Sequence, residues 1–435
     1  MVSQRIIEKI FVVCSLLFFS GAGSYFIAPA NHLYLLVQIV ANIIQIVTIL
    51  LIGIRWKKIV PFVIKEKLLW ILVGLTVAST LWSELPFMAA LFHDHGPGAG
   101  VIPFIRVTLF GVYFAASYGL KEQMQLLTWT FGAAVLLSIV VALGLPHYGV
   151  TGSMVFLEED ARHAGAWRGL YTHKNLFGII MVLSAMVFRL VHIHHNRWIA
   201  WTGFILSIAL ILLSTSKTAL ILLLTFLCLL PLYKALRWNY NLAVPFFIAL
   251  ILIGGGMATL FLENAATILG ALGRDLTFTG RTDIWSGVVN KIWERPWLGY
   301  GYHTFWLSVT DGTIDVWSPT INRFMILPHA HNGFLDLSLD IGLLGLFLFM
   351  FSYVKVSLQA IQYLRLNQSS EGILPLAYLL FMVQFNLSEP SLMREDIYWI
   401  LYVSLTLSLQ NFNSLVKHHT SYRRQAETQV TATIR

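Results

Sequence analysis

Long apolar runs separated by short polar segments constrain this chain more than any other feature. A helix needs about 20 apolar residues to cross the hydrocarbon core of a bilayer. Twelve runs reach or approach this length, at residues 10–30, 33–54, 68–82, 103–120, 126–144, 175–192, 198–213, 218–233, 241–261, 334–352, 373–388 and 396–411. Only 11% of the residues are charged, against about 25% in soluble domains. The sequence therefore predicts an all-α polytopic membrane protein with about 12 transmembrane helices, and it excludes an ordinary soluble enzyme.

The first apolar run has some features of a cleavable signal peptide. Arg5 and Lys9 precede it, and it ends in the small residues Ala28-Pro29-Ala30, as a cleavage site would. The run is long for the apolar part of a signal peptide, however, and a second run follows it at once. We interpret it as an uncleaved first span.

The distribution of Lys and Arg predicts which loops face the cytoplasm. One alternating set of loops, together with both termini, carries 18 of the 29 Lys and Arg residues. Cytoplasmic loops carry an excess of these residues, so we expect both termini in the cytoplasm. The chain is expected to form one membrane domain over residues 1–435, with a polar cytoplasmic tail at 412–435.

The other eleven cationic residues fall in outer loops or at the outer ends of spans. Two outer loops are long, at residues 145–174 and 262–333, and the second far exceeds an ordinary connection. These loops are also rich in His, Asn, Trp and Gly. We therefore expect an anionic ligand on the outer face. The net charge of +8 does not indicate nucleic-acid binding, because no basic stripe lies on a soluble face.

The large outer loop contains a predicted amphipathic helix. Apolar residues recur at helical spacing at Trp285, Val288, Val289, Ile292 and Trp293. Thr282 is the expected N-cap, and Arg295-Pro296 is the expected end. Arg281 then lies just before the helix, where free N–H groups and the helix dipole favour a phosphate. The alternative is an arginine that extends to the lipid headgroups.

The same loop also carries aromatic residues and histidines. Between Trp297 and His303, glycines alternate with aromatics, so Tyr300 and Tyr302 either stack on sugar rings or belong to an interfacial aromatic belt. His329 and His331 are two apart and point the same way in an extended chain. His331 is either a general base for a hydroxyl or a structural histidine at a helix start. Zinc is not predicted, because no third ligand stands at metal spacing.

Three more cations and one carboxylate lie near these loops. Arg168 and Lys174 lead into the sixth span, and Lys217 lies in a turn of hydroxyl residues. Lys217 either holds an anion or marks the membrane boundary. Glu389 lies in the turn before the last span, where it either serves the site or pairs locally with Arg394.

Six motifs in one order resemble the O-antigen ligase and O-antigen polymerase superfamily. They are WSELP (82–86), YTHKN (171–175), STSK (214–217), GRTDIW (280–285), RPWLGYG (295–301) and HAHNGFLDLSLDIGLLG (329–345). The sequences of these motifs are most similar to the exopolysaccharide-polymerase branch, and the resemblance runs from about residue 79 to 400. It implies a GT-C-like membrane glycosyltransferase in the bacterial inner membrane, with its site on the periplasmic face.

The resemblance also implies a reaction and its participants. A glycan passes from an undecaprenyl diphosphate carrier to a sugar hydroxyl, with inversion and without a metal or other cofactor. The implied partners are this lipid-linked donor, a growing glycan or lipid A–core as acceptor, membrane lipid and a chain-length regulator, but no nucleic acid.

Site residues follow from the same resemblance. Arg281 matches the arginine expected on the diphosphate, and His331 matches the histidine expected as base or acceptor-orienting group. Lys217 stands where many members have arginine, so bidentate phosphate binding there is in doubt. Arg168 and Lys174 match a basic region that we also assign to the diphosphate. The acceptor-binding groups are expected to be His329, Asn332, Tyr300, Tyr302 and Glu389.

Three functions compete on the sequence. The first is a polymerase of lipid-linked repeats. The second is a ligase that moves the finished glycan to lipid A–core, which differs only in its acceptor. The third is a transporter or flippase of the lipid-linked glycan. Transporters place ionisable groups at the bilayer midplane on broken helices, often within inverted repeats. Here these groups collect at the outer ends of spans, and no repeat is visible.

Overall fold

The computed structural model describes residues 2–23, 34–83, 100–152, 164–191, 197–238, 281–310, 329–367 and 369–412. Within these ranges the chain is helical, and the only β-type pairing is the isolated bridge between Val150 and Trp167. The predicted all-α class is therefore confirmed for the described residues.

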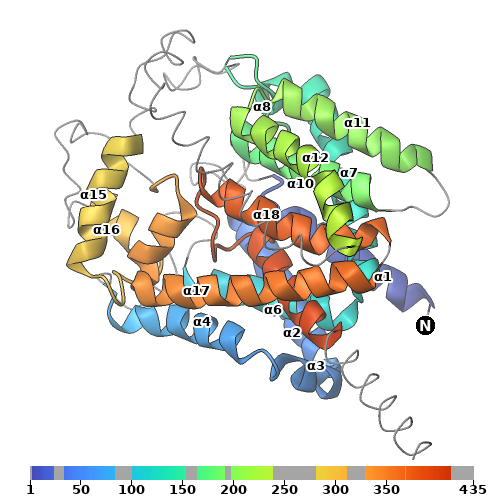
Figure 1. Cartoon of the computed structure of the whole chain (residues 1–435). Helices are drawn as coiled ribbons and strands as arrows, with labels where there is room; N and C mark the ends of the chain where they lie inside the picture. Colours follow the sequence, from blue (N-terminus) through green and yellow to red (C-terminus); the bar gives the residue numbers. More distant parts are fainter. Residues whose placement is uncertain are drawn as a thin grey trace, which may run out of the picture.

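The helices follow the predicted spans closely. In order they are α1 (Val2–Phe19), α2 (Tyr34–Ile54), α3 (Trp56–Val63), α4 (Lys67–Ala78), α6 (Val101–Ser117), α7 (Leu120–Gly144), α8 (Pro146–Gly149), α10 (Lys174–Leu190), α11 (Arg197–Leu213), α12 (Lys217–Trp238), α15 (Arg281–Glu294), α16 (Phe305–Thr310), α17 (Gly333–Leu366), α18 (Leu374–Asn386) and a last helix over residues 397–412 (Figure 1). Eleven of the twelve predicted spans coincide with a helix, and the twelfth, 241–261, lies outside the described residues. The first was placed too far along the chain, since α1 already ends at Phe19.

Four of the described helices are long and apolar enough to cross a membrane. They are Leu36–Ile54, Leu120–Gly144, Lys217–Arg237 and Gly333–Leu366. Three shorter apolar segments are Lys67–Leu81, Val101–Ser117 and Arg197–Leu213. The described part of the chain is thus all-helical with membrane-spanning candidates, and the total of twelve spans stays a prediction.

The core of the bundle forms around α10. Nearly every residue of this helix is buried, from Lys174 to Leu190, and it packs against α7, α11 and α12. A helix that is apolar on all sides has to be enclosed by others or by lipid. Since Lys174 is its first residue, the burial of α10 fixes that lysine at one end of the bundle.

Helix α17 is interrupted near its start, and residues 296–301 close the gap. Ile341 and Gly342 have non-helical backbone angles. The freed carbonyl of Leu339 accepts from the Tyr300 N–H at 2.7 Å, and the freed N–H of Leu343 donates to the Pro296 carbonyl at 2.7 Å. Backbone groups that are freed within a membrane must find partners inside the protein, and residues 296–301 supply them. The RPWLGYG motif is therefore explained by backbone pairing.

Two glycines make this close backbone approach feasible. Gly299 (φ +69°) and Gly342 (φ +71°) both adopt left-handed angles. A Cβ at Gly299 would lie 2.4 Å from the Leu339 carbonyl oxygen, and a Cβ at Gly342 would lie 2.1 Å from the Trp297 carbonyl oxygen. Only glycine fits at such positions without a shift of the backbone.

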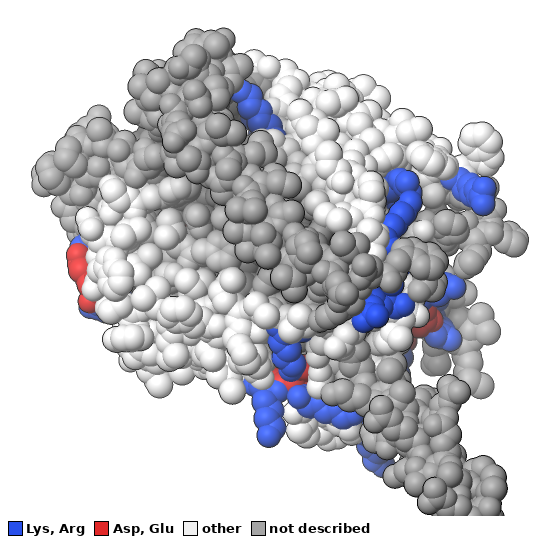
Figure 2. Space-filling model, viewed as in Figure 1, with Lys and Arg blue, Asp and Glu red and all other residues white. Residues whose placement is uncertain are grey.

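The predicted cytoplasmic cations lie away from the start of α17. Figure 2 shows basic side chains over α3 and around the side where α1 begins, and few beside α15. Three ion pairs join the elements at this end: Arg5 with Glu122 at 2.8 Å, Arg55 with Glu8 at 2.7 Å, and Lys355 with Glu66 at 2.7 Å. The fold thus separates these charges from the loop that carries His331.

Candidate functional site

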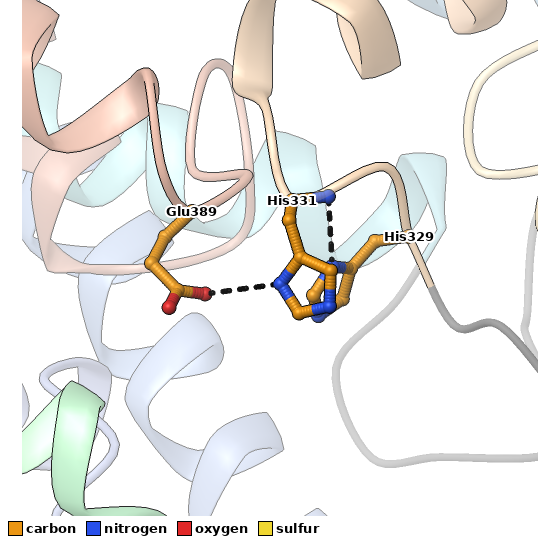
Figure 3. A group of neighbouring side chains, drawn as sticks. All are labelled: His329, His331 and Glu389. Atoms are coloured by element: carbon orange, nitrogen blue, oxygen red, sulfur yellow. Dashed lines mark hydrogen bonds and ion pairs between the residues drawn. The ribbon is translucent and has the colours of Figure 1, made fainter. Parts of the chain in front are cut away.

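Four segments that are distant in sequence meet beside His331. They are the loop before α17, the turn after α18, the start of α10 and the turn before α12. The Glu389 carboxylate lies 4.0 Å from His331 Nδ1, and Figure 3 shows it facing the imidazole, with His329 close beside the ring. Asn175 Nδ2 donates to Glu389 at 3.3 Å, and Ser216 Oγ donates to Asn175 at 3.1 Å. A continuous polar chain therefore leads from Ser216 to the imidazole.

A lysine accompanies this chain. Lys174 precedes Asn175 at the start of α10, is only 9% exposed, and donates from Nζ to Thr215 Oγ1 at 3.4 Å. The YTHKN and STSK motifs therefore contact each other directly. They add a buried cation next to the amide that holds Glu389.

The backbone of the His331 loop is strained and well supported. His331 has a left-handed φ of +52°, and such angles in non-glycine residues are often found at functional sites. Its N–H donates to His329 Nδ1 at 3.2 Å. Asn332 Oδ1 caps α17 by accepting from the Phe334 N–H at 3.0 Å. The side chains of His331 and Glu389 are 31% and 18% exposed, so a ligand can reach them.

Both polar groups of the Ala330 peptide are also held. Its N–H donates to Asp336 Oδ1 at 3.0 Å, and its carbonyl accepts from Trp285 Nε1 at 2.8 Å. Asp336 Oδ1 also accepts from Trp306 Nε1 at 2.9 Å. Trp285 belongs to α15, whose first residue is Arg281. The helix that begins with the predicted diphosphate ligand is thereby tied to the residue between the two histidines.

A buried group of charges lies below this loop. Arg394 is 3.0 Å from Asp340 and 3.6 Å from Asp336, and we call these three residues the ionic cluster. Burial lowers the pKa of Arg394, but the two aspartates outweigh this effect and raise it overall. The local pair of Glu389 with Arg394 that the sequence allowed does not form. A buried carboxylate without a partner is costly, so Arg394 pairs with α17 and leaves Glu389 to His331.

The predicted cationic ligands do not all reach this place. Arg281 is the first residue of α15, and its side chain lies outside the described residues. Thr282, the predicted N-cap, instead falls inside the helix, which already begins at Arg281. Lys217 is exposed at the start of α12. Arg168 is 6% exposed and donates to the carbonyl oxygens of Tyr148 at 2.9 Å and His147 at 3.4 Å, so it ties a loop to α8.

The two tyrosines of the GYG segment are buried. Tyr300 and Tyr302 are 3% and 2% exposed. The Tyr300 hydroxyl donates to the Lys291 carbonyl at 3.0 Å, and the Tyr302 hydroxyl donates to the Met393 carbonyl at 2.6 Å. Their surroundings favour packing over sugar stacking. The same holds for the Asn332 side chain, whose oxygen caps a helix.

Glu389 supplies the third ligand that the sequence did not show. Ligand atoms of His329, His331 and Glu389 all lie within 4.8 Å of one another, which is close enough to hold a metal ion. In the described geometry, however, His329 Nδ1 already accepts the His331 N–H. The residues that sequence reasoning missed are Asn175 and Ser216. Both lie in motifs of which only the lysines were chosen.

Part of this chain matches known proteins. Residues 202–350 match the family model described as O-antigen ligase. The exopolysaccharide production protein ExoQ of Rhizobium meliloti is 32% identical over 104 residues, which are 23% of this chain and 24% of that protein. A protein of Rickettsia prowazekii, named as a candidate polysaccharide ligase, is 30% identical over 126 residues, which are 28% of this chain and 30% of that protein. The matches thus cover about a quarter to a third of these relatives. The resemblance drawn from the six motifs is confirmed.

Proposed function

We propose that this chain, whose residues 202–350 match the O-antigen ligase family, is a membrane glycosyltransferase that extends a lipid-linked polysaccharide. The observation that carries the proposal is the His331–Glu389 pair. The HAHN, YTHKN and STSK motifs and the turn Ser388-Glu389-Pro390 meet at this pair. In the proposed topology twelve helices span the bacterial inner membrane, both termini are cytoplasmic, and His331 faces the periplasm.

His331 acts as the general base in this proposal. The oxygen of an acceptor hydroxyl attacks the anomeric carbon of the donor sugar, and its proton passes to the imidazole. The bond from that carbon to the diphosphate oxygen breaks, and the diphosphate leaves with the electron pair. A carboxylate beside an imidazole orients the ring and stabilises its protonated form. The distance of 4.0 Å between the Glu389 carboxylate and His331 Nδ1 supports this role for Glu389.

The leaving diphosphate needs positive charge in a poorly hydrated place. Lys174 lies close by, since its neighbour Asn175 donates to Glu389. Arg281, at the start of α15, would add a guanidinium and free N–H groups. Lys217 is a further ligand in this proposal, and Arg168 acts at a distance by fixing its loop.

A transporter of the same lipid is the second candidate, and the break in α17 favours it. Broken helices with buried charges line the substrate sites of many transporters. In this chain, though, residues 296–301 already bond to the freed backbone groups of the break, so these groups are not left to coordinate an ion. This pairing favours the glycosyltransferase.

The test uses the purified protein in detergent with a lipid-diphosphate oligosaccharide repeat from its own host. A ladder of products that is absent for His331→Ala supports a polymerase, with the exposed His147→Ala as a matched control that keeps the ladder. Transfer that requires added lipid A–core would make the protein a ligase. Flipping of the lipid in vesicles without transfer would establish the transporter.

Two additions make the assay sharper. Arg281→Ala should raise the KM for the donor, and Arg281→Lys should recover only part of the loss, because lysine lacks the bidentate fork. The ladder should also survive EDTA. A loss that zinc restores would instead make His329, His331 and Glu389 a metal site.

A further inference from the structure

A second histidine–carboxylate pair lies next to the ionic cluster and has no part in the reaction proposed above. His303 Nε2 is 3.0 Å from Glu395 Oε2. The other carboxylate oxygen of Glu395 accepts from the Gly100 N–H at 3.1 Å. This pair is shorter than the one between His331 and Glu389, which measures 4.0 Å.

The two pairs are built on the same supports. Both carboxylates come from the turn between α18 and the last helix. Asp340 accepts from the His303 N–H at 3.2 Å, as Asp336 accepts from the Ala330 N–H at 3.0 Å, one turn earlier on α17. Arg394 pairs with both aspartates. The two loops are therefore anchored one turn apart on the first part of α17, and Arg394 joins the two anchoring aspartates.

The backbone at His303 is held in a costly conformation. Its φ of +59° is left-handed, like that of His331. Gly301 (φ +102°), two residues before His303, has no room for a side chain, since a Cβ would lie 2.9 Å from Ser83 Cβ. Strain of this kind persists only where the surrounding structure enforces it. Here the enforced conformation directs the imidazole to Glu395.

One face of this imidazole remains available. The His303 side chain is 24% exposed, while that of Glu395 is 8% exposed. Burial raises the pKa of Glu395, but His303 and Arg394 lower it overall. The ionised carboxylate accepts from His303 Nε2, so Nδ1 is the ring nitrogen that remains for a ligand. Among the described residues none bonds to that Nδ1.

The charge around His303 selects a neutral ligand. Asp336, Asp340 and Glu395 outnumber the single arginine of the cluster, so a diphosphate is disfavoured here. We infer that His303 is a further substrate-binding residue, whose Nδ1 forms a hydrogen bond with a sugar hydroxyl of the acceptor glycan. This inference rests on the proposed function, and it extends the acceptor site from the His331 loop to the second loop that is anchored on α17.

The experiment depends on which ring nitrogen is kept. Glutamine places its amide nitrogen near Nε2 and can still donate to Glu395, but it offers nothing in place of Nδ1. The assay fixes the lipid-linked repeat as donor and varies the free oligosaccharide repeat, released from the lipid by mild acid, as acceptor. His303→Gln should raise the acceptor KM about tenfold, as expected for one lost hydrogen bond, while kcat changes much less.

The outcomes separate the alternatives. An unchanged acceptor KM in His303→Gln, with a rise only in His303→Ala, would mean that the pair with Glu395 is structural, and it would overturn the inference. A fall in kcat at constant KM would also overturn it. If the wild-type protein forms no product with this donor and acceptor, the proposed function fails, and the inference fails with it.

Discussion

The indole of Trp285 donates a hydrogen bond of 2.8 Å to the carbonyl oxygen of Ala330, the residue between His329 and His331. Trp285 lies one turn after Arg281 on α15. Ile284, Val288 and Ile292 of the same helix pack in a small apolar cluster that includes Ala330. This hydrogen bond and this apolar cluster together hold the helix that begins with Arg281 against the loop that carries His331.

Trp285→Phe should therefore impair catalysis more than folding. Phenylalanine keeps the aromatic packing but lacks the indole N–H, so the His331 loop loses its hydrogen bond to α15. We expect kcat to fall about tenfold, as small misplacements of reacting groups are costly, with little change in melting temperature. Trp293→Phe is the control, because Trp293 on the same helix is 67% exposed. Equal rates for the two variants would refute the role of the contact.

Glu389→Gln should slow transfer without unfolding the protein. Glutamine can still accept from Asn175, but it cannot stabilise a protonated His331. The loss in kcat should be about 10²-fold, at the lower end of general acid–base effects. Glycan transfer at saturating donor measures it. A variant that keeps wild-type kcat would show that the 4.0 Å pair has no role in proton transfer.

The sequence predicted the elements far better than their contacts. Long apolar runs predicted eleven segments that the structure shows as helices, because burial in lipid or protein demands such runs. The motif around His331 could also be found, because its residues are adjacent in the sequence. The partner of His331 comes from a turn 58 positions later, and no spacing rule encodes such a contact.

Two other contacts show why local interpretation fails. The segment around Tyr300 and Tyr302 has the composition of a sugar-binding turn. In the fold, however, its backbone bonds to the interrupted helix α17 and both tyrosines are buried. Gly342 gave no sign of that interruption, since a glycine inside an apolar run is common in membrane helices. Arg394 had a glutamate nearby in sequence, yet two buried aspartates bind it in the fold.

Gly342→Ala should destabilise the protein strongly. The new Cβ would lie 2.1 Å from the Trp297 carbonyl oxygen at a left-handed φ, so residues 296–301 would have to separate from the break in α17. A loss on the order of 3 kcal/mol is expected, visible as a lower melting temperature in detergent. Gly74→Ala is the matched control, because nothing lies within 4 Å of its Cβ in helix α4. That change should be neutral or stabilising by about 1 kcal/mol.

Arg394→Met should be similarly harmful, because it leaves two buried carboxylates unpaired. The cost of breaking a buried ion pair from one side is about 3–5 kcal/mol. Adding Asp336→Asn and Asp340→Asn to this variant should recover part of it. Arg5→Met is the control, since its pair with Glu122 is 65% and 35% exposed and is worth about 1 kcal/mol or less. Equal melting temperatures for the two single variants would contradict a stabilising ionic cluster.

Glu395 predicts a pH dependence whose sign can be worked out. Burial raises the pKa of its carboxyl, but His303 and Arg394 lower it overall, below the ordinary value of 4.5. Above that ordinary value the carboxylate is ionised in both states, and its native pairing stabilises the fold fully. As the pH falls below this value, the carboxyl is protonated first in the unfolded state. The stabilisation is therefore lost progressively until the pH has passed the lower pKa of the folded state.

Glu395→Gln isolates this contribution. The variant should melt below the wild type at neutral pH, and the gap should narrow as the pH drops below 4.5, because the wild type loses what the variant never had. Melting curves in detergent across this range measure it. If the gap in melting temperature instead widens on acidification, burial raises the pKa of Glu395 more than the pairing with His303 lowers it, and the ionised carboxylate destabilises the fold.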